Sequence, residues 1–193
     1  TGIGASALYS NTTASNNTAV GYRSSSNNTT GNFNSSLGQD SLYSNTSGAN
    51  NVAIGYSALE NNTTADNNTA VGWEAMVTNT TGTVNAAFVR RALYGNTTGS
   101  SNTAVGNFSN GANTTGSYNV AVGQQSLNAN TTSSGNTAVG YQAGYSQTTA
   151  SGGSSSFFGY QAGYSLTGLF CTFVGGQAGY SATSGQSNTF VGH

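Results

Sequence analysis

The ionisable side chains are the first candidates for chemistry, and they are few. The acids and the single histidine are Asp40, Glu60, Asp66, Glu74 and His193. Their spacing forms no catalytic carboxylate pair and no metal-ligand cluster, and Cys171, the single thiol, has no histidine partner nearby in sequence. No glycine run has the pattern of a phosphate or dinucleotide loop. Because catalysis needs titratable groups gathered in a pocket, the sequence predicts neither an enzyme nor any cofactor or metal.

Four of the charged residues share one regular spacing. Arg23 and Asp40 are 17 residues apart, and so are Glu74 and Arg91. If the chain stacks 17 residues per layer, each pair lies on adjacent rungs. We therefore expect two ion pairs, each worth about 0.2–1 kcal/mol, which also test the register.

That spacing belongs to a motif repeated along the whole chain, as in NTAVGY at 17–22. Its glycines are Gly4, Gly21, Gly38, Gly55, Gly72, Gly106, Gly123, Gly140, Gly159, Gly175 and Gly192. Most steps are 17 residues; Val89 stands where a further glycine would fall, and the phase breaks only between Gly140 and Gly175. A short fixed period is typical of a solenoid. We predict an all-β parallel solenoid of about eleven 17-residue coils, forming one array over 1–193, with regular coils over 1–140 and altered GYQAGYS-type coils over 141–193.

Positions in each coil are numbered here from the motif glycine, which is position 0. The segment from −4 to +1 is rich in strand-forming residues, and alternation places the residues at −1 and +1 on one large apolar face. Asn, Ala and Gly at −4, −2 and 0 form a small opposite face. We expect a second short strand around Ala58-Leu59 and its equivalents, followed by a turn at N-T-T-G.

Asparagine recurs at position −4 and predicts an amide ladder along the axis. Its members are Asn17, Asn34, Asn51, Asn68, Asn85, Asn102, Asn119, Asn136 and Asn188. Ser155 and Cys171 interrupt this row, and we interpret Cys171 as a small buried substitute.

A second asparagine row falls in the turn, at position +7. Its members Asn11, Asn28, Asn45, Asn62, Asn79, Asn96, Asn113 and Asn130 each begin an N-x-S/T sequon. Stacked coils would align them on one exposed edge. The row is either plain turn chemistry or a line of glycosylation sites.

Composition limits the partners. The formal net charge is −1 and only 7 of 193 residues are charged, so no basic patch can hold nucleic acid, and no apolar run is long enough to enter a membrane. A coil with a small Ala/Gly face is thin, and its Val/Ile face needs cover. We expect a homotrimer of parallel chains around a shared axis. The competing geometry is a wider single-chain solenoid with valine in its own core.

The N-T/V-A-V/I-G motif resembles the head repeats of YadA-like trimeric autotransporter adhesins. The GYQAGYS form at Gly140–Ser146 is also similar to repeats of bacteriophage tail-fibre shafts. The adhesin resemblance implies a left-handed parallel β-roll of three chains wound into one rod.

The function that follows is a structural and adhesive fibre segment, extracellular, on a cell surface or a virion, and part of a longer fibre. Its partners would be two further copies and a surface glycan or host receptor. Tyr141, Tyr145, Tyr160, Tyr164 and Tyr180 either stack on sugars or form surface ladders. Alternatives are a glycosylated extracellular filament and an ice-binding solenoid with flat threonine rows. Adjacent Thr12 and Thr13 weaken the last idea, since strand neighbours face opposite ways.

Overall fold

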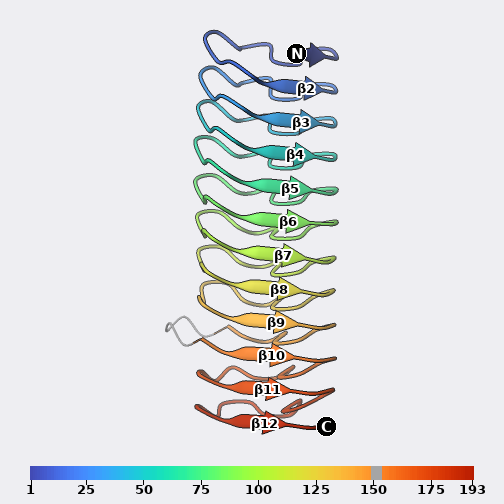
Figure 1. Ribbon diagram of the computed structural model, residues 1–193, viewed down its shortest axis with the longest axis vertical. Helices are drawn as coiled ribbons and strands as arrows, with labels where there is room; N and C mark the ends of the chain where they lie inside the picture. The colour runs from blue at the N-terminus through green and yellow to red at the C-terminus, as the bar shows by residue number, and fades with distance from the viewer. Residues whose placement is uncertain (149–153) are drawn as a thin grey trace.

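The chain stacks into a column with one short strand per coil (Figure 1). A computed structural model describes residues 1–148 and 154–193. The strands are β1 (Gly2–Ile3), β2 (Thr18–Val20), β3 (Ser35–Leu37), β4 (Val52–Ile54), β5 (Thr69–Val71), β6 (Ala86–Phe88), β7 (Thr103–Val105), β8 (Val120–Val122), β9 (Thr137–Val139), β10 (Ser156–Phe158), β11 (Thr172–Val174) and β12 (Thr189–Val191). They form one parallel 12-stranded sheet in chain order. The predicted all-β parallel solenoid is confirmed.

The register follows the sequence repeat. Val52 lies beside Thr69, which lies beside Ala86, so each step between neighbouring strands is one repeat. Across the phase break Ser156 pairs with Thr137 on one side and with Thr172 on the other, so the sheet continues in register. A further expectation, that the chain tolerates deletion of two residues within 151–154, falls mainly outside the described residues.

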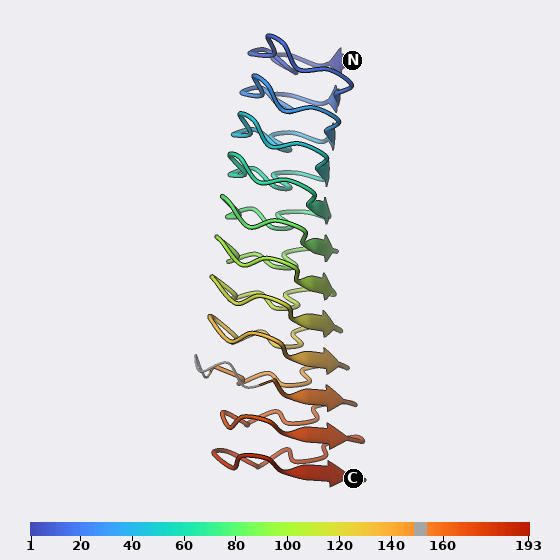
Figure 2. The same ribbon diagram turned by 60° about the vertical axis from the view of Figure 1, so that its left-hand side comes forward.

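The expected second strand is wrong. Residues 56–61 and their equivalents form turns rather than strands, and two positions in each of these turns have left-handed backbone. In one coil these are Ser57 at position +2 (φ 51°) and Leu59 at position +4 (φ 52°). Left-handed backbone breaks the alternation of a strand, so both Ala58 and Leu59 can point inward. Seen from the side, each coil is therefore one strand closed by irregular turns (Figure 2).

The core is narrow and lies inside each coil. Alanine at −2 and +3 and leucine or methionine at +4 are fully buried, as at Ala53, Ala58 and Leu59. The residue at −1 points outward, and Leu37 and Ile54 are 52% and 39% exposed. The wider solenoid with these side chains in its own core is therefore wrong, because the interior of each coil is filled by the residues at −2, +3 and +4 and the −1 side chains lie outside it.

The altered coils fill the same space by a different pair of residues. Position −2 becomes Phe157 and Phe173, both fully buried, while position +4 becomes Gly163 and Gly179. A Cβ on Gly163 would lie 2.4 Å from the Phe157 ring, so the phenylalanine occupies the space of the usual leucine side chain. The regular coils thus have alanine at −2 and leucine at +4, and the altered coils have phenylalanine at −2 and glycine at +4, with a similar total side-chain volume.

Candidate interaction surfaces

The asparagine row at position −4 is a ladder in the structure. Its Oδ1 atoms accept from the backbone N–H of the next ladder asparagine, at 2.8–3.0 Å. From Asn17 to Asn119, each Nδ2 donates to a backbone carbonyl 14 residues on, as from Asn51 to Ala65 at 2.9 Å. The predicted ladder is confirmed from Asn17 to Asn136, although most contacts run through backbone rather than from amide to amide. Asn188, in the last coil, is half-buried.

The two residues expected to interrupt this ladder continue it with weaker groups. Ser155 donates its backbone N–H to Asn136 at 3.0 Å, and its Oγ accepts from the N–H of Cys171 at 3.2 Å. The Cys171 thiol lies 3.4 Å from the Gly185 carbonyl, 14 residues on, where an asparagine amide would donate. Cys171 is buried, as expected, and it replaces the ladder amide with a thiol donor.

The turn row at position +7 does not form an exposed edge, and that expectation is wrong. Asn28, Asn45, Asn62, Asn79, Asn96, Asn113 and Asn130 are fully buried, and Asn11 is half-buried. Nδ2 of Asn62 donates to Oδ1 of Asn45 at 2.9 Å and to the Ala65 carbonyl at 3.0 Å. A glycosylated Nδ2 keeps one hydrogen and could not make both bonds. Amide-to-amide bonds are continuous along this row, whereas the strand row has them at only three steps, of 3.2–3.3 Å.

Both predicted ion pairs are confirmed. Arg23 Nε lies 2.7 Å from Asp40 Oδ1, and Arg91 Nε lies 2.7 Å from Glu74 Oε2. The hydrogen bond that Arg23 donates to the Asp40 carboxylate raises the pKa of Arg23 above its ordinary value. The Arg91 guanidinium also lies 4.6 Å from the Trp73 ring centre. Trp73 is at position +1 and Arg91 is at position +2. The contact between them shows that the side chains of these two positions share one surface, just after the bend at the motif glycine.

Farther along, position +2 carries a glutamine ladder that the sequence analysis did not identify. Gln142 donates to Gln125 at 2.9 Å, Gln161 to Gln142 at 2.8 Å and Gln177 to Gln161 at 3.3 Å. The signal was available, because the four glutamines occupy the same motif position, +2, as the ion-paired residues. The same row thus holds opposite charges in early coils and amides in later ones.

Tyrosine ladders lie on both sides of these glutamines. Tyr145, Tyr164 and Tyr180 stack successively at 5.1 Å, and Tyr141 stacks on Tyr160 at 5.4 Å. Burial of the Tyr164 hydroxyl, with its phenol neighbours, raises the pKa of that group above its ordinary value. Rings stacked this way cover one another's faces. Along most of each row, this favours the interpretation that the tyrosines form surface ladders rather than platforms for sugars.

The turn threonines at position +8 are occupied by backbone contacts. Thr46 Oγ1 donates to the Thr63 carbonyl at 3.1 Å, and Thr80 Oγ1 donates to the Thr97 carbonyl at 3.0 Å. Their donor hydrogens are therefore not free for an ordered water layer, which weakens the ice-binding alternative.

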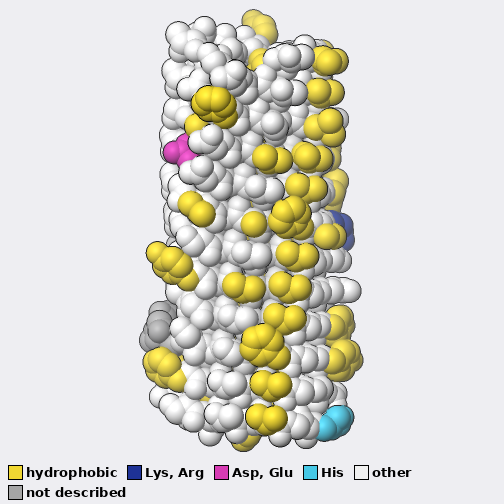
Figure 3. Space-filling model, in the orientation of Figure 1, with side chains coloured by type: hydrophobic (Ala, Val, Ile, Leu, Met, Phe, Trp, Pro, Cys, Tyr) yellow, Lys and Arg dark blue, Asp and Glu magenta, His cyan; other side chains and the backbone are white. Residues whose placement is uncertain are grey.

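An apolar row runs along the sheet at position −1. Hydrophobic side chains form vertical rows over the strands in Figure 3. The row consists of Ile3, Val20, Leu37, Ile54, Val71, Phe88, Val105, Val122, Val139, Phe158, Val174 and Val191, all exposed or half-exposed. No polar residue interrupts it from β1 to β12, so it is the longest uniform surface feature of the described chain.

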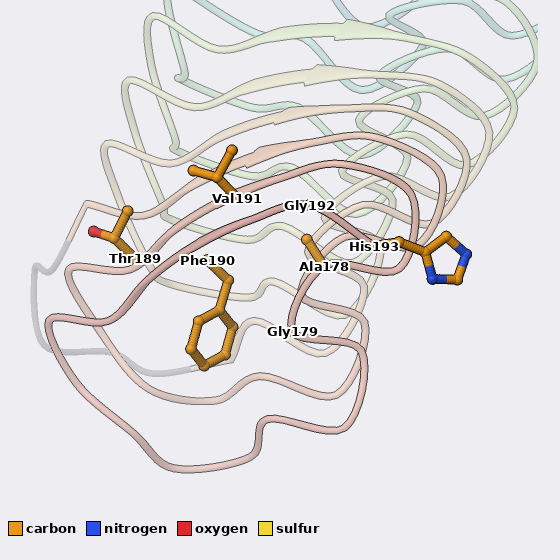
Figure 4. A pocket seen from close by; sticks show the side chains of 7 residues that line it. All are labelled: Ala178, Gly179, Thr189, Phe190, Val191, Gly192 and His193. Carbon is orange, nitrogen blue, oxygen red and sulfur yellow. The ribbon is translucent and has the colours of Figure 1, made fainter.

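The last coil has a pocket of about 400 Å³ beside β12, lined by Ala178, Gly179, Thr189, Phe190, Val191, Gly192 and His193. Its only ionisable side chain, His193, points away from Phe190 in Figure 4. Within the described residues no three His, Cys, Asp or Glu side chains gather as metal ligands, and no helix could cross a membrane.

Comparison with known proteins gives no further identification. No family model, no curated protein and no solved structure matches the chain.

Proposed function

We propose that this chain is a rod segment of an extracellular adhesive fibre, on a cell surface or a virion, and that three parallel copies associate through the −1 row. The observation that carries the proposal is that row. Twelve successive coils each leave one apolar side chain uncovered on the same sheet face. An exposed apolar surface of this length is typical of an interaction site.

The repeat favours identical partners over a different protein. A second copy has the same row at the same spacing, so parallel copies match coil by coil. Closed rotational symmetry then covers every row, and a trimer is the form that the adhesin resemblance implies. The row itself carries no charge, so burial leaves no ion unpaired.

The adhesive role rests on the resemblance and on the absence of catalytic parts in the sequence. A rod with one strand per coil gives length and stiffness, and it displays the same side chains at regular intervals. Its partner would be a surface glycan or another host receptor.

Light scattering in solution tests the association. The native chain is expected at three times 19.3 kDa. Replacing Val71, Val105 and Val122 by asparagine should give a folded particle of single-chain mass, because the −1 row would lose its apolar contacts.

The matched control replaces Thr64, Thr81 and Thr98 by asparagine in the exposed turn, and it should remain trimeric. A stable and soluble monomer of the native chain would contradict the proposed assembly.

A further inference from the structure

The aromatic row at position +1 ends at an uncovered ring. Tyr160 stacks on Tyr141 with an interplanar angle of 16°, which covers one of its faces. The next residue of the row is Gly176, where a Cβ would meet no atom within 4 Å. Tyr160 is 54% exposed. In the next coil, therefore, no side chain at position +1 stacks on its second face.

The other aromatic ladder of this row ends differently. Tyr56 stacks on Trp73, and the Arg90 and Arg91 guanidinium groups lie 4.9 and 4.6 Å from the Trp73 ring centre. That ring face is covered by cations of its own chain. At Tyr160 the corresponding cover is absent, because Gly176 has no side chain.

Free amide groups border the same space. Gln177 is exposed, and its Nε2 donates to Gln161 Oε1 at 3.3 Å. Gln177 ends the glutamine ladder, so its Oε1 accepts no hydrogen bond within the described residues. The backbone N–H of Gln177 donates to the Tyr160 carbonyl at 2.7 Å, so the two residues are neighbours on adjacent coils, and Gln177 brings a free acceptor and remaining amide hydrogens next to the Tyr160 position.

Charge decides which ligand suits this space. From Ala92 to Gly192 the sequence has no Asp, Glu, Lys or Arg. Among these residues an anion would find no Lys or Arg, and an organic cation would find no carboxylate side chain. The one ionisable side chain of this row beyond Gly176 is His193, at position +1 of the next coil. A neutral ligand with one apolar face and a rim of hydroxyls fits the ring and the amides.

We propose that Tyr160, Gln161 and Gln177 form a subsite for one pyranose ring of a neutral glycan. The proposal deepens the adhesive part of the proposed function and rests on it. The C–H face of the sugar packs on the free face of Tyr160, a hydroxyl donates to Gln177 Oε1, and Gln177 Nε2 donates to a sugar oxygen. One ring is a weak contact, so three copies on a rod supply the affinity by multivalency.

The test uses NMR of the native chain with maltohexaose and cellohexaose as probes. One or both should shift the Gly176 N–H and the Gln177 side-chain amide, with a Kd on the order of 1 mM. Gly176→Tyr extends the tyrosine stack into the open space, so it should keep the fold and weaken binding at least about tenfold, or 1.4 kcal/mol.

The matched control is Gln124→Tyr, which extends the same row beyond Tyr141 at its opposite end. Gln124 is exposed, and this variant should bind sugar as the native chain does. Light scattering on the same samples reports the oligomeric state, so a failure of the rod assembly is distinguished from a failure of the sugar site.

Three results would overturn the subsite. The first is the absence of amide shifts with either sugar at about ten times the expected Kd. The second is undiminished binding by Gly176→Tyr. The third is tighter binding of tetramethylammonium than of either sugar at Tyr160, which would make the free ring face a cation site.

Discussion

At the scale of single residues, we expect each buried amide of the turn row to stabilise the stack more than either ion pair does. Asn62 donates to Asn45 and to the Ala65 carbonyl, and it accepts from Asn79 at 3.0 Å. We expect Asn62→Ala to lower the free energy of unfolding by about 2–4 kcal/mol, because it leaves buried partners unsatisfied. Urea denaturation followed by circular dichroism measures the change.

The neighbouring Asn61 provides the control. It is exposed and donates to the Val77 carbonyl at 2.9 Å. Since water replaces that bond, Asn61→Ala should lower the free energy of unfolding by no more than about 1 kcal/mol. Equal losses for both variants would show that burial of the turn row adds no stability.

Val89 is the one non-glycine residue at the motif glycine position, and its backbone differs from that of the glycines. Its φ is 84°, whereas the motif glycines have φ of 127–139°. The hydrogen bond from Gly106 N–H to the Phe88 carbonyl is 3.1 Å, against 2.7–2.9 Å for its equivalents. We expect Val89→Gly to raise the free energy of unfolding by up to about 1 kcal/mol. Glycine removes the backbone strain of the folded state, and this gain should exceed the loss from the greater entropy of the unfolded chain. Thermal unfolding measures it.

Replacing a motif glycine by a residue with a side chain tests the same explanation. A Cβ at Gly55 would lie 2.5 Å from the Gly72 carbonyl oxygen in the next coil, so Gly55→Ala should destabilise the fold. If Val89→Gly lowers stability, this position does not need glycine and the long hydrogen bond from Gly106 to Phe88 has another cause.

At the scale of one coil, the exchange of leucine for phenylalanine makes a coupled pair. Phe157→Ala should lower the free energy of unfolding by about 3–5 kcal/mol, because it empties the space between Gly144 and Gly163. Gly163→Leu alone should also destabilise, since its Cβ would overlap the Phe157 ring. Together they restore the alanine–leucine pair of the earlier coils, and the double variant should be more stable than either single one.

A double-mutant cycle by urea denaturation gives the coupling energy. Leucine already adopts the required backbone at Leu59 (φ 52°), so the conformation at Gly163 (φ 64°) is within its reach. Additive losses in the cycle would show that phenylalanine and leucine do not share one space.

Much of the coil could be predicted from its sequence, and the failures have physical causes. The strand, its register and the ion pairs follow from a period that identical residues make visible. The second strand was wrong because Ser57 and Leu59 adopt left-handed backbone, which non-glycine residues seldom do and which no propensity indicates. The exposed edge at Asn62 was wrong because polarity suggested solvent, whereas a repeated amide can satisfy itself inside the stack.

At the scale of the whole molecule, the core is two clusters rather than one. One runs from Leu42 to Ala104 and the other begins at Ala121. Between them Asn110 occupies the leucine position, fully buried, and its Nδ2 has no hydrogen-bond partner within the described residues. The strained Val89 lies one coil earlier. In a column whose units contact only their neighbours, we expect this stretch to be a weak joint between the two clusters.

Hydrogen exchange should find that joint. Under native conditions the backbone amides of 89–112 should exchange faster than those of 53–76 and 121–143, because local opening begins where core contacts are fewest. Asn110→Leu should slow exchange across the joint and raise the urea midpoint, since it removes an unsatisfied amide and joins the two clusters. Leu93→Asn, which places a second amide in an intact coil, should create a new fast-exchanging segment there. Uniform exchange along the native column would mean that the two clusters open as a single cooperative unit.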